Sequence, residues 1–165
     1  MAAITVTGYA YIVSLSMAEL GRGAEAIQLL RELEPKIPTR IRDLMVAARM
    51  MLEGNAEESI AAIDRVAASE LQDPEALFYL ARQLARLRQP GAAIALLKRA
   101  IESGFCCLPA LEGDPWLAPV RRKPAFSTLL RRAAASHHAA AHAFEDLRGA
   151  RFLGLRDVSA ETGDQ

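Results

Sequence analysis

The chain has few of the residues from which most catalytic and metal sites are built. Its 165 residues include three histidines, two cysteines and one tryptophan. All three histidines lie between His137 and His142, and no serine has the flanking sequence of a nucleophile elbow. We therefore expect no enzyme, no catalytic residue, and no metal or other cofactor.

The histidines leave one alternative open. His138 and His142 are four residues apart on an expected helix and could face one metal ion, with Glu145 or Asp146 one turn further on. The pair lacks the glutamate that serves as the base of zinc proteases, so a solvated, alanine-rich helix is the favoured interpretation. Metal-dependent activity at this helix stays an alternative.

The chain also lacks net charge. It has 20 basic and 20 acidic residues, so no strong overall field attracts nucleic acid or an anionic membrane. One basic cluster comprises Arg121, Arg122, Lys123, Arg131 and Arg132. No aromatic stacking residues accompany it, so we interpret it as a solvated face. We expect neither a nucleic-acid partner nor a membrane partner.

Long apolar runs are missing too. No stretch reaches the ~18–20 apolar residues of a membrane span. The apolar start, Met1 to Met17, has neither the basic region nor the clear cleavage site of a secretory signal. Cys106 and Cys107 are adjacent, which favours buried or half-buried thiols in a reducing compartment over a disulfide. We therefore expect a cytoplasmic protein.

The residues that are abundant predict helices. Hydrophobic residues make up 52% of the chain and aromatic residues only 5%, which favours an all-α protein rich in Ala and Leu. In residues 74–105 one helix places Leu77, Leu80, Ala81 and Leu84 on one face, and a second does so with Ala93, Ile94, Leu97, Ala100 and Ile101. Gln89-Pro90-Gly91 breaks the run between them. The segment therefore predicts a helical hairpin.

The same pattern recurs towards the N-terminus. Ala26, Ser59 and Ala93 follow one another at almost equal intervals along the chain. Each is followed by an isoleucine, and further matches are Leu30, Ile63 and Leu97, then Leu33, Val66 and Ala100. A helix-turn-helix unit that recurs about every 34 residues resembles the tetratricopeptide (TPR) family. That resemblance implies a right-handed solenoid of three hairpins.

The resemblance also divides the chain. The expected parts are hairpins at about 7–39, 40–73 and 74–105, a proline-rich capping segment at 106–123, a terminal helix at 124–149 and a mobile tail at 150–165. Asp73, Asn55 with Glu58, and Asp114 have the spacing of helix caps. Trp116 is expected to cover the exposed end of the third hairpin, because a terminal repeat needs such a cover.

The C-terminal part resembles a more specific group. Asp114-Pro115-Trp116-Leu117-Ala118-Pro119-Val120-Arg121 and the helix after Pro124 look like the end of TPR regions in large bacterial signalling proteins. Those regions follow Ser/Thr kinase, nucleotide cyclase or transcription-regulator domains. This sequence shows no kinase, cyclase or DNA-binding motif.

The resemblance implies a function for the concave face of the array, which binds peptides in the family. Carried over by position, its lining is Tyr11, Leu15, Leu44, Ala48, Met51, Phe78, Arg82 and Arg86. We expect non-catalytic binding of a protein or peptide carrying an acidic residue. One alternative is regulatory self-association through the apolar N-terminal hairpin, giving a homo-oligomer. A sensor module detached from a signalling effector domain is another.

Overall fold

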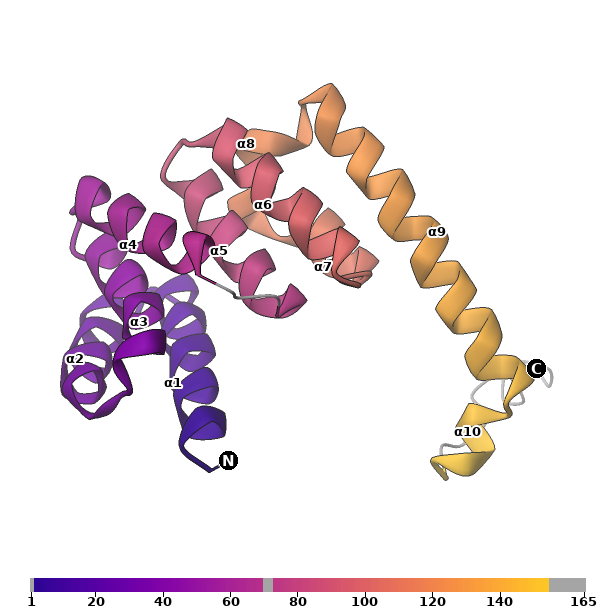
Figure 1. Ribbon diagram of the computed structural model, residues 1–165, viewed down its shortest axis with the longest axis horizontal. Helices are drawn as coiled ribbons and strands as arrows, with labels where there is room; N and C mark the ends of the chain where they lie inside the picture. Colours follow the sequence, from indigo (N-terminus) through magenta and orange to yellow (C-terminus); the bar gives the residue numbers. More distant parts are fainter. Residues whose placement is uncertain (1, 70–72, 155–165) are drawn as a thin grey trace, which may run out of the picture.

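The structure is a computed structural model that describes residues 2–69 and 73–154, with only the backbone given for residues 2–8 and 39–41. These residues form helices and no strand, which confirms the all-α prediction for them. The first six helices pack in consecutive pairs (Figure 1). They are α1 (Ala2–Glu19), α2 (Gly23–Leu33), α3 (Thr39–Leu52), α4 (Ala56–Ala68), α5 (Pro74–Arg86) and α6 (Pro90–Glu102), with the 3-10 turn η1 (Glu34–Lys36) after α2.

The first helix of each pair ends in the same way. Gly21, Gly54 and Arg88 have φ angles of 80°, 85° and 59°, and they occupy equivalent positions in the three repeats. The next residue donates its N–H to a carbonyl five residues back, at distances of 2.9, 2.8 and 2.8 Å. This is the helix-ending motif that needs one left-handed residue, and glycine supplies that conformation in the first two pairs. The sequence repeat is therefore also a repeat of backbone geometry.

Side-chain burial repeats along the second helices. Ala26, Ser59 and Ala93 are each 0% exposed, and so are Leu30, Ile63 and Leu97 one turn later. Small residues at the first set let the two helices of a pair approach closely. In the second pair the Ser59 hydroxyl donates to the carbonyl of Ala47 at 2.8 Å, which satisfies a polar group inside the contact.

Ala93→Leu tests this packing. We expect the larger side chain to overfill the α5–α6 contact and to lower the free energy of unfolding by about 1–3 kcal/mol. Ala95 is exposed on the same helix, so Ala95→Leu is the matched control and should change stability little. Urea unfolding followed by circular dichroism measures both. Equal stability of the two variants would contradict the hairpin packing.

Two of the three expected helix caps form. Asp73 accepts hydrogen bonds from the backbone N–H groups of Glu75 and Ala76 at 2.9 and 3.0 Å. Asp114 accepts from the N–H of Trp116 at 2.8 Å. The expected capping box at Asn55 is wrong, because its side chain makes no cap hydrogen bond. The Asn55 amide instead lies 3.7 Å from the sulfur of Met50 in the preceding helix.

The proline-rich segment folds against the third pair. It contains α7 (Leu108–Gly113), the 3-10 turn η2 (Pro115–Leu117) and α8 (Ala118–Arg121). Leu111, Leu117 and Val120 are buried in the same cluster as residues of α5 and α6. Trp116 is 8% exposed, but it belongs to a second cluster, with residues of α1, α2 and α3. The expected burial of Trp116 is confirmed, and the indole joins the cluster built around the first and second pairs.

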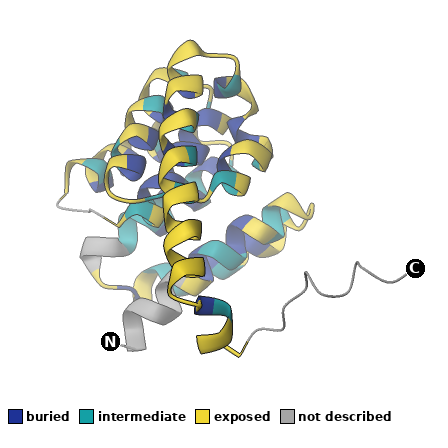
Figure 2. Cartoon of the chain, turned by 90° about the vertical axis from the view of Figure 1, so that its right-hand side faces the viewer, coloured by how far each residue is buried: buried dark blue, intermediate teal, exposed yellow. Residues whose placement is uncertain are grey.

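The terminal helix α9 (Pro124–Asp146) leaves the rest of the molecule along its length (Figure 1). Phe126, Leu129 and Ala133 are buried in the cluster that contains α6 and α7. Residues 138–146 are exposed, as Figure 2 shows for the helix facing the viewer. No helix in the described ranges is both long enough and apolar enough to cross a membrane.

Both ends of the described chain differ from expectation. Helix α1 starts at Ala2 rather than near residue 7, and α10 (Gly149–Phe152) occupies the start of the expected mobile tail. Residues 155–165 of that tail lie outside the described residues. The residue between α9 and α10, Arg148, has a left-handed backbone conformation with a φ angle of 51°. Gly149 lies against the Phe144 ring, which would have to move to make room for a Cβ at this position.

Candidate functional site

Most of the side chains expected to line a peptide groove are buried inside the chain. Leu44 is half-buried and Arg86 is exposed. The others are 0–7% exposed, namely Tyr11, Leu15, Ala48, Met51, Phe78 and Arg82. They therefore offer little surface to a partner.

Direct contact between the first and third helix pairs accounts for part of this burial. The Gln83 side chain of α5 donates a hydrogen bond to the Tyr11 hydroxyl of α1. The Tyr11 ring also meets the Tyr79 ring edge to face, with centroids 5.9 Å apart. Such edge contacts between aromatic rings are favourable. Helices α1 and α5 thus touch across the face on which the groove was expected.

Arg82 links three separate parts of the chain at this face. Its guanidinium forms an ion pair with Glu19 at the end of α1, and another, 2.6 Å long, with Asp114 before η2. It also lies 4.4 Å from the centre of the Trp116 ring. Arg86 approaches the same ring at 4.4 Å. Because guanidinium groups are attracted to aromatic faces, the two arginines help to hold Trp116 in place.

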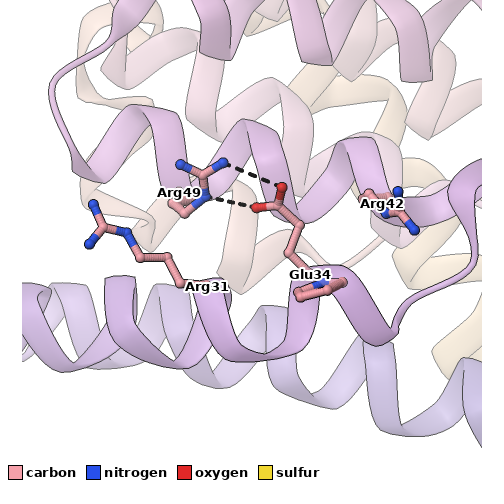
Figure 3. Close-up of a pocket in the computed structure, with 5 residues that line it drawn as sticks. Arg31, Glu34, Arg42 and Arg49 are labelled. Carbon is pink, nitrogen blue, oxygen red and sulfur yellow. Dashed lines mark hydrogen bonds and ion pairs between the residues drawn. The ribbon is translucent and has the colours of Figure 1, made fainter.

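A second candidate site is a pocket of about 370 Å³ between α2, η1 and α3 (Figure 3). Its lining consists of Arg31, Glu34, Pro35, Arg42 and Arg49. The Arg49 guanidinium faces the Glu34 carboxylate, whereas the guanidinium groups of Arg31 and Arg42 point away from it (Figure 3). The volume of the pocket is within the usual range for small-molecule sites, but its lining is mostly charged rather than apolar.

Comparison with known proteins does not assign either site. No family model, no curated protein and no solved structure matches the chain. The roles of the groove residues and of the arginine pocket therefore depend on the chemistry of the residues themselves.

The buried Tyr11 hydroxyl predicts a loss of stability at alkaline pH. Burial raises the pKa of Tyr11 well above its ordinary value of 10.0, while the nearby Arg82 charge lowers it by a smaller amount. The unfolded chain loses this proton near pH 10 and the folded chain keeps it. The free energy of unfolding therefore decreases as pH rises above about 10.

Tyr11→Phe separates this effect from the rest of the molecule. We expect a shallower alkaline decline than in the wild type, and about 1–3 kcal/mol lower stability at neutral pH because Gln83 loses its partner. Tyr9 is 73% exposed, so Tyr9→Phe is the control and should leave stability at pH 7 unchanged. Urea unfolding over a pH series measures all three proteins. An identical alkaline decline in Tyr11→Phe would contradict the account.

The histidines are not part of a group of side chains that could coordinate a metal ion among the described residues. His142 pairs with Asp146 at 3.1 Å, and both side chains are largely exposed. Within the described ranges, no group of three or more His, Cys, Asp or Glu side chains is placed to hold a metal ion. Cys106 is a half-buried free thiol, and Cys107 is exposed rather than buried.

The residues of the basic cluster around Arg121 and Arg132 make different contacts. Arg132 pairs with Glu102 at 3.0 Å, and Arg121 donates to the Asp114 carbonyl. Arg132 also lines a pocket of about 340 Å³ between α6 and α9, together with Lys98.

Sequence reasoning did not single out the arginine pocket. Arg42 and Arg49 are seven residues apart on α3, so they lie on one side of that helix. That spacing was the one feature of the sequence that could have pointed to this pocket. Arg31 comes from α2, and its approach depends on how α2 packs against α3.

Proposed function

We propose that the chain is a non-catalytic protein-interaction module built as a short, right-handed, TPR-like solenoid. The observation that supports this proposal is the repeat of backbone geometry and burial from one helix pair to the next. Stacked hairpins of this kind form extended surfaces that bind other proteins.

The accessible part of the expected groove is its first candidate contact. Leu44 and Arg86 keep exposed surface, and Arg86 presents a cation to solvent beside Trp116. A partner segment with an acidic residue suits this charge. The contact between α1 and α5 closes the face on which the groove was expected, and we call this the closed face. Such a segment would bind along the edge of the closed face rather than within it.

Panning a phage-displayed peptide library against the purified full chain tests the function. We expect enriched peptides to be acidic and to bind Arg86→Glu more weakly than wild type. Arg22 is an exposed arginine in the connection between α1 and α2, and Arg22→Glu is the matched charge control. No enrichment against a chain that unfolds cooperatively would contradict a peptide-binding role.

Self-association is the second candidate, and exposed apolar side chains favour it. Tyr9 and Leu20 of the first pair are 73% and 76% exposed. Burial of apolar side chains of this size against a second copy of the chain would be favourable. Light scattering over a concentration series is the test. A mass that increases with concentration in the wild type but not in Leu20→Ser supports self-association, and a monomer throughout contradicts it.

A further inference from the structure

The arginine pocket contains one positive charge in excess of its local carboxylates. Glu34 accepts from Arg49 at 2.7 and 3.4 Å, so its two oxygens are engaged. Glu53, just outside the lining, accepts from Arg49 and from Arg31, each at 3.0 Å. Bidentate and shared pairs of this kind neutralise both carboxylates. Glu34 therefore does not repel an anion as a free carboxylate would.

Arg42 carries the excess charge. Its guanidinium donates one hydrogen bond, from Nη2 to the carbonyl of Ile37 at 3.1 Å. In the part of the chain that the structure describes, Arg42 has no carboxylate partner, and its buried Nε has no hydrogen-bond partner. A guanidinium has five N–H donors, and leaving buried ones unpaired costs free energy. An incoming oxyanion can relieve that cost.

The neighbouring groups are suited to hold such a ligand. Arg31, whose side chain is 65% exposed, stays paired with the largely buried Glu53 and adds positive charge at the edge of the pocket. Arg49 is only 15% exposed and is fixed between its two carboxylates. Pro35 adds an apolar wall. In Figure 3, Arg42 lies on the opposite side of Glu34 from Arg31 and Arg49, at one end of the site.

We propose that this pocket binds an oxyanion group of a protein partner, a carboxylate or a phosphoryl group, with Arg42 as its main ligand. Both groups present paired oxygens that match the planar fork of a guanidinium. The inference rests on the proposed interaction function and places a specific contact outside the expected groove, at the junction of the first two helix pairs.

Nuclear magnetic resonance titration of the ¹⁵N-labelled full chain tests the site with two small probes. Glutarate represents a carboxylate and phenyl phosphate a phosphoryl group, each compared with potassium chloride at the same ionic strength. We expect saturable shifts of the Arg42 side-chain Nε–H signal and of neighbouring amides. The probe that binds more tightly identifies the oxyanion.

Three variants decide between specific binding and a general effect of charge. Arg42→Met should weaken binding by about tenfold or more, because it removes charge-assisted hydrogen bonds. Arg42→Lys keeps the charge but loses the fork, and should bind with intermediate affinity. Arg22→Met removes an exposed arginine that does not line the pocket and should bind like the wild type.

Two results would overturn the proposal. One is the absence of saturable shifts with both probes. The other is equal binding by Arg42→Met, Arg42→Lys and wild type, each shown to be folded by its amide spectrum. Because both probes are free small molecules, such a result would leave the interaction function itself standing. Failure of the peptide panning would, in turn, leave a positive titration intact.

Discussion

Replacing Trp116 by alanine is expected to lower the free energy of unfolding by about 3–5 kcal/mol. The indole is 8% exposed and shares a cluster with side chains of α1, α2 and α3. Its loss leaves a cavity between the capping segment and the first two helix pairs. It also removes the ring against which Arg82 and Arg86 lie. Denaturant unfolding followed by circular dichroism measures the change.

Two further variants separate the loss of a buried ring from the loss of any aromatic side chain. Phe152 is 88% exposed, so Phe152→Ala removes a large aromatic side chain without opening a buried cavity. It should change stability by less than about 0.5 kcal/mol. Trp116→Phe should lie between wild type and alanine, since it keeps a ring but loses volume. A neutral Trp116→Ala result would make Trp116 a surface residue and remove the proposed closure of the face.

Replacing Arg82 by alanine is expected to cost a similar amount, about 3–5 kcal/mol. The Arg82 and Asp114 side chains are 9% and 7% exposed, and the variant leaves that carboxylate buried without its cation. Glu19 loses its partner as well. Thermal and urea unfolding of the full chain measure the loss.

The matched control for Arg82 lies one turn away. Arg86 is exposed and contacts the same indole, so Arg86→Ala should cost only about 0.5–1 kcal/mol. The double variant Arg82→Met with Asp114→Asn should recover much of the stability, because it removes both buried charges together. Equal effects of Arg82→Ala and Arg86→Ala would show that Arg82 does not link the three segments.

The sequence predicts helices and their pairing because those features depend on local spacing. Apolar residues three and four apart define the faces of α5 and α6. The regular spacing of the repeats locates equivalent turns, such as those at Gly21 and Gly54. Asp73 caps α5 through bonds to residues only two and three positions away. All of these features can be read from residues close together in the sequence or from their recurrence.

The closed face could not be predicted in the same way. Arg82 and Glu19 are 63 residues apart, and Gln83 and Tyr11 are 72 apart. Arg82 and Arg86 of α5 are both chemically able to bind a partner's carboxylate. A single sequence does not show that Arg82 already forms an ion pair with Asp114. The position of η2 brings Trp116 and Asp114 against Arg82. The same limit applies to the arginine pocket, whose parts come from α2, η1 and α3.

The fluorescence of Trp116 tests most directly whether the capping segment closes the expected groove. The chain has one tryptophan, so its emission reports on this position alone. We expect blue-shifted emission from the native chain with weak quenching by acrylamide. We further expect stronger quenching in folded Arg82→Ala. Native emission that is red-shifted and as readily quenched as in the unfolded chain would contradict the closure and return the face to the open groove predicted from the sequence.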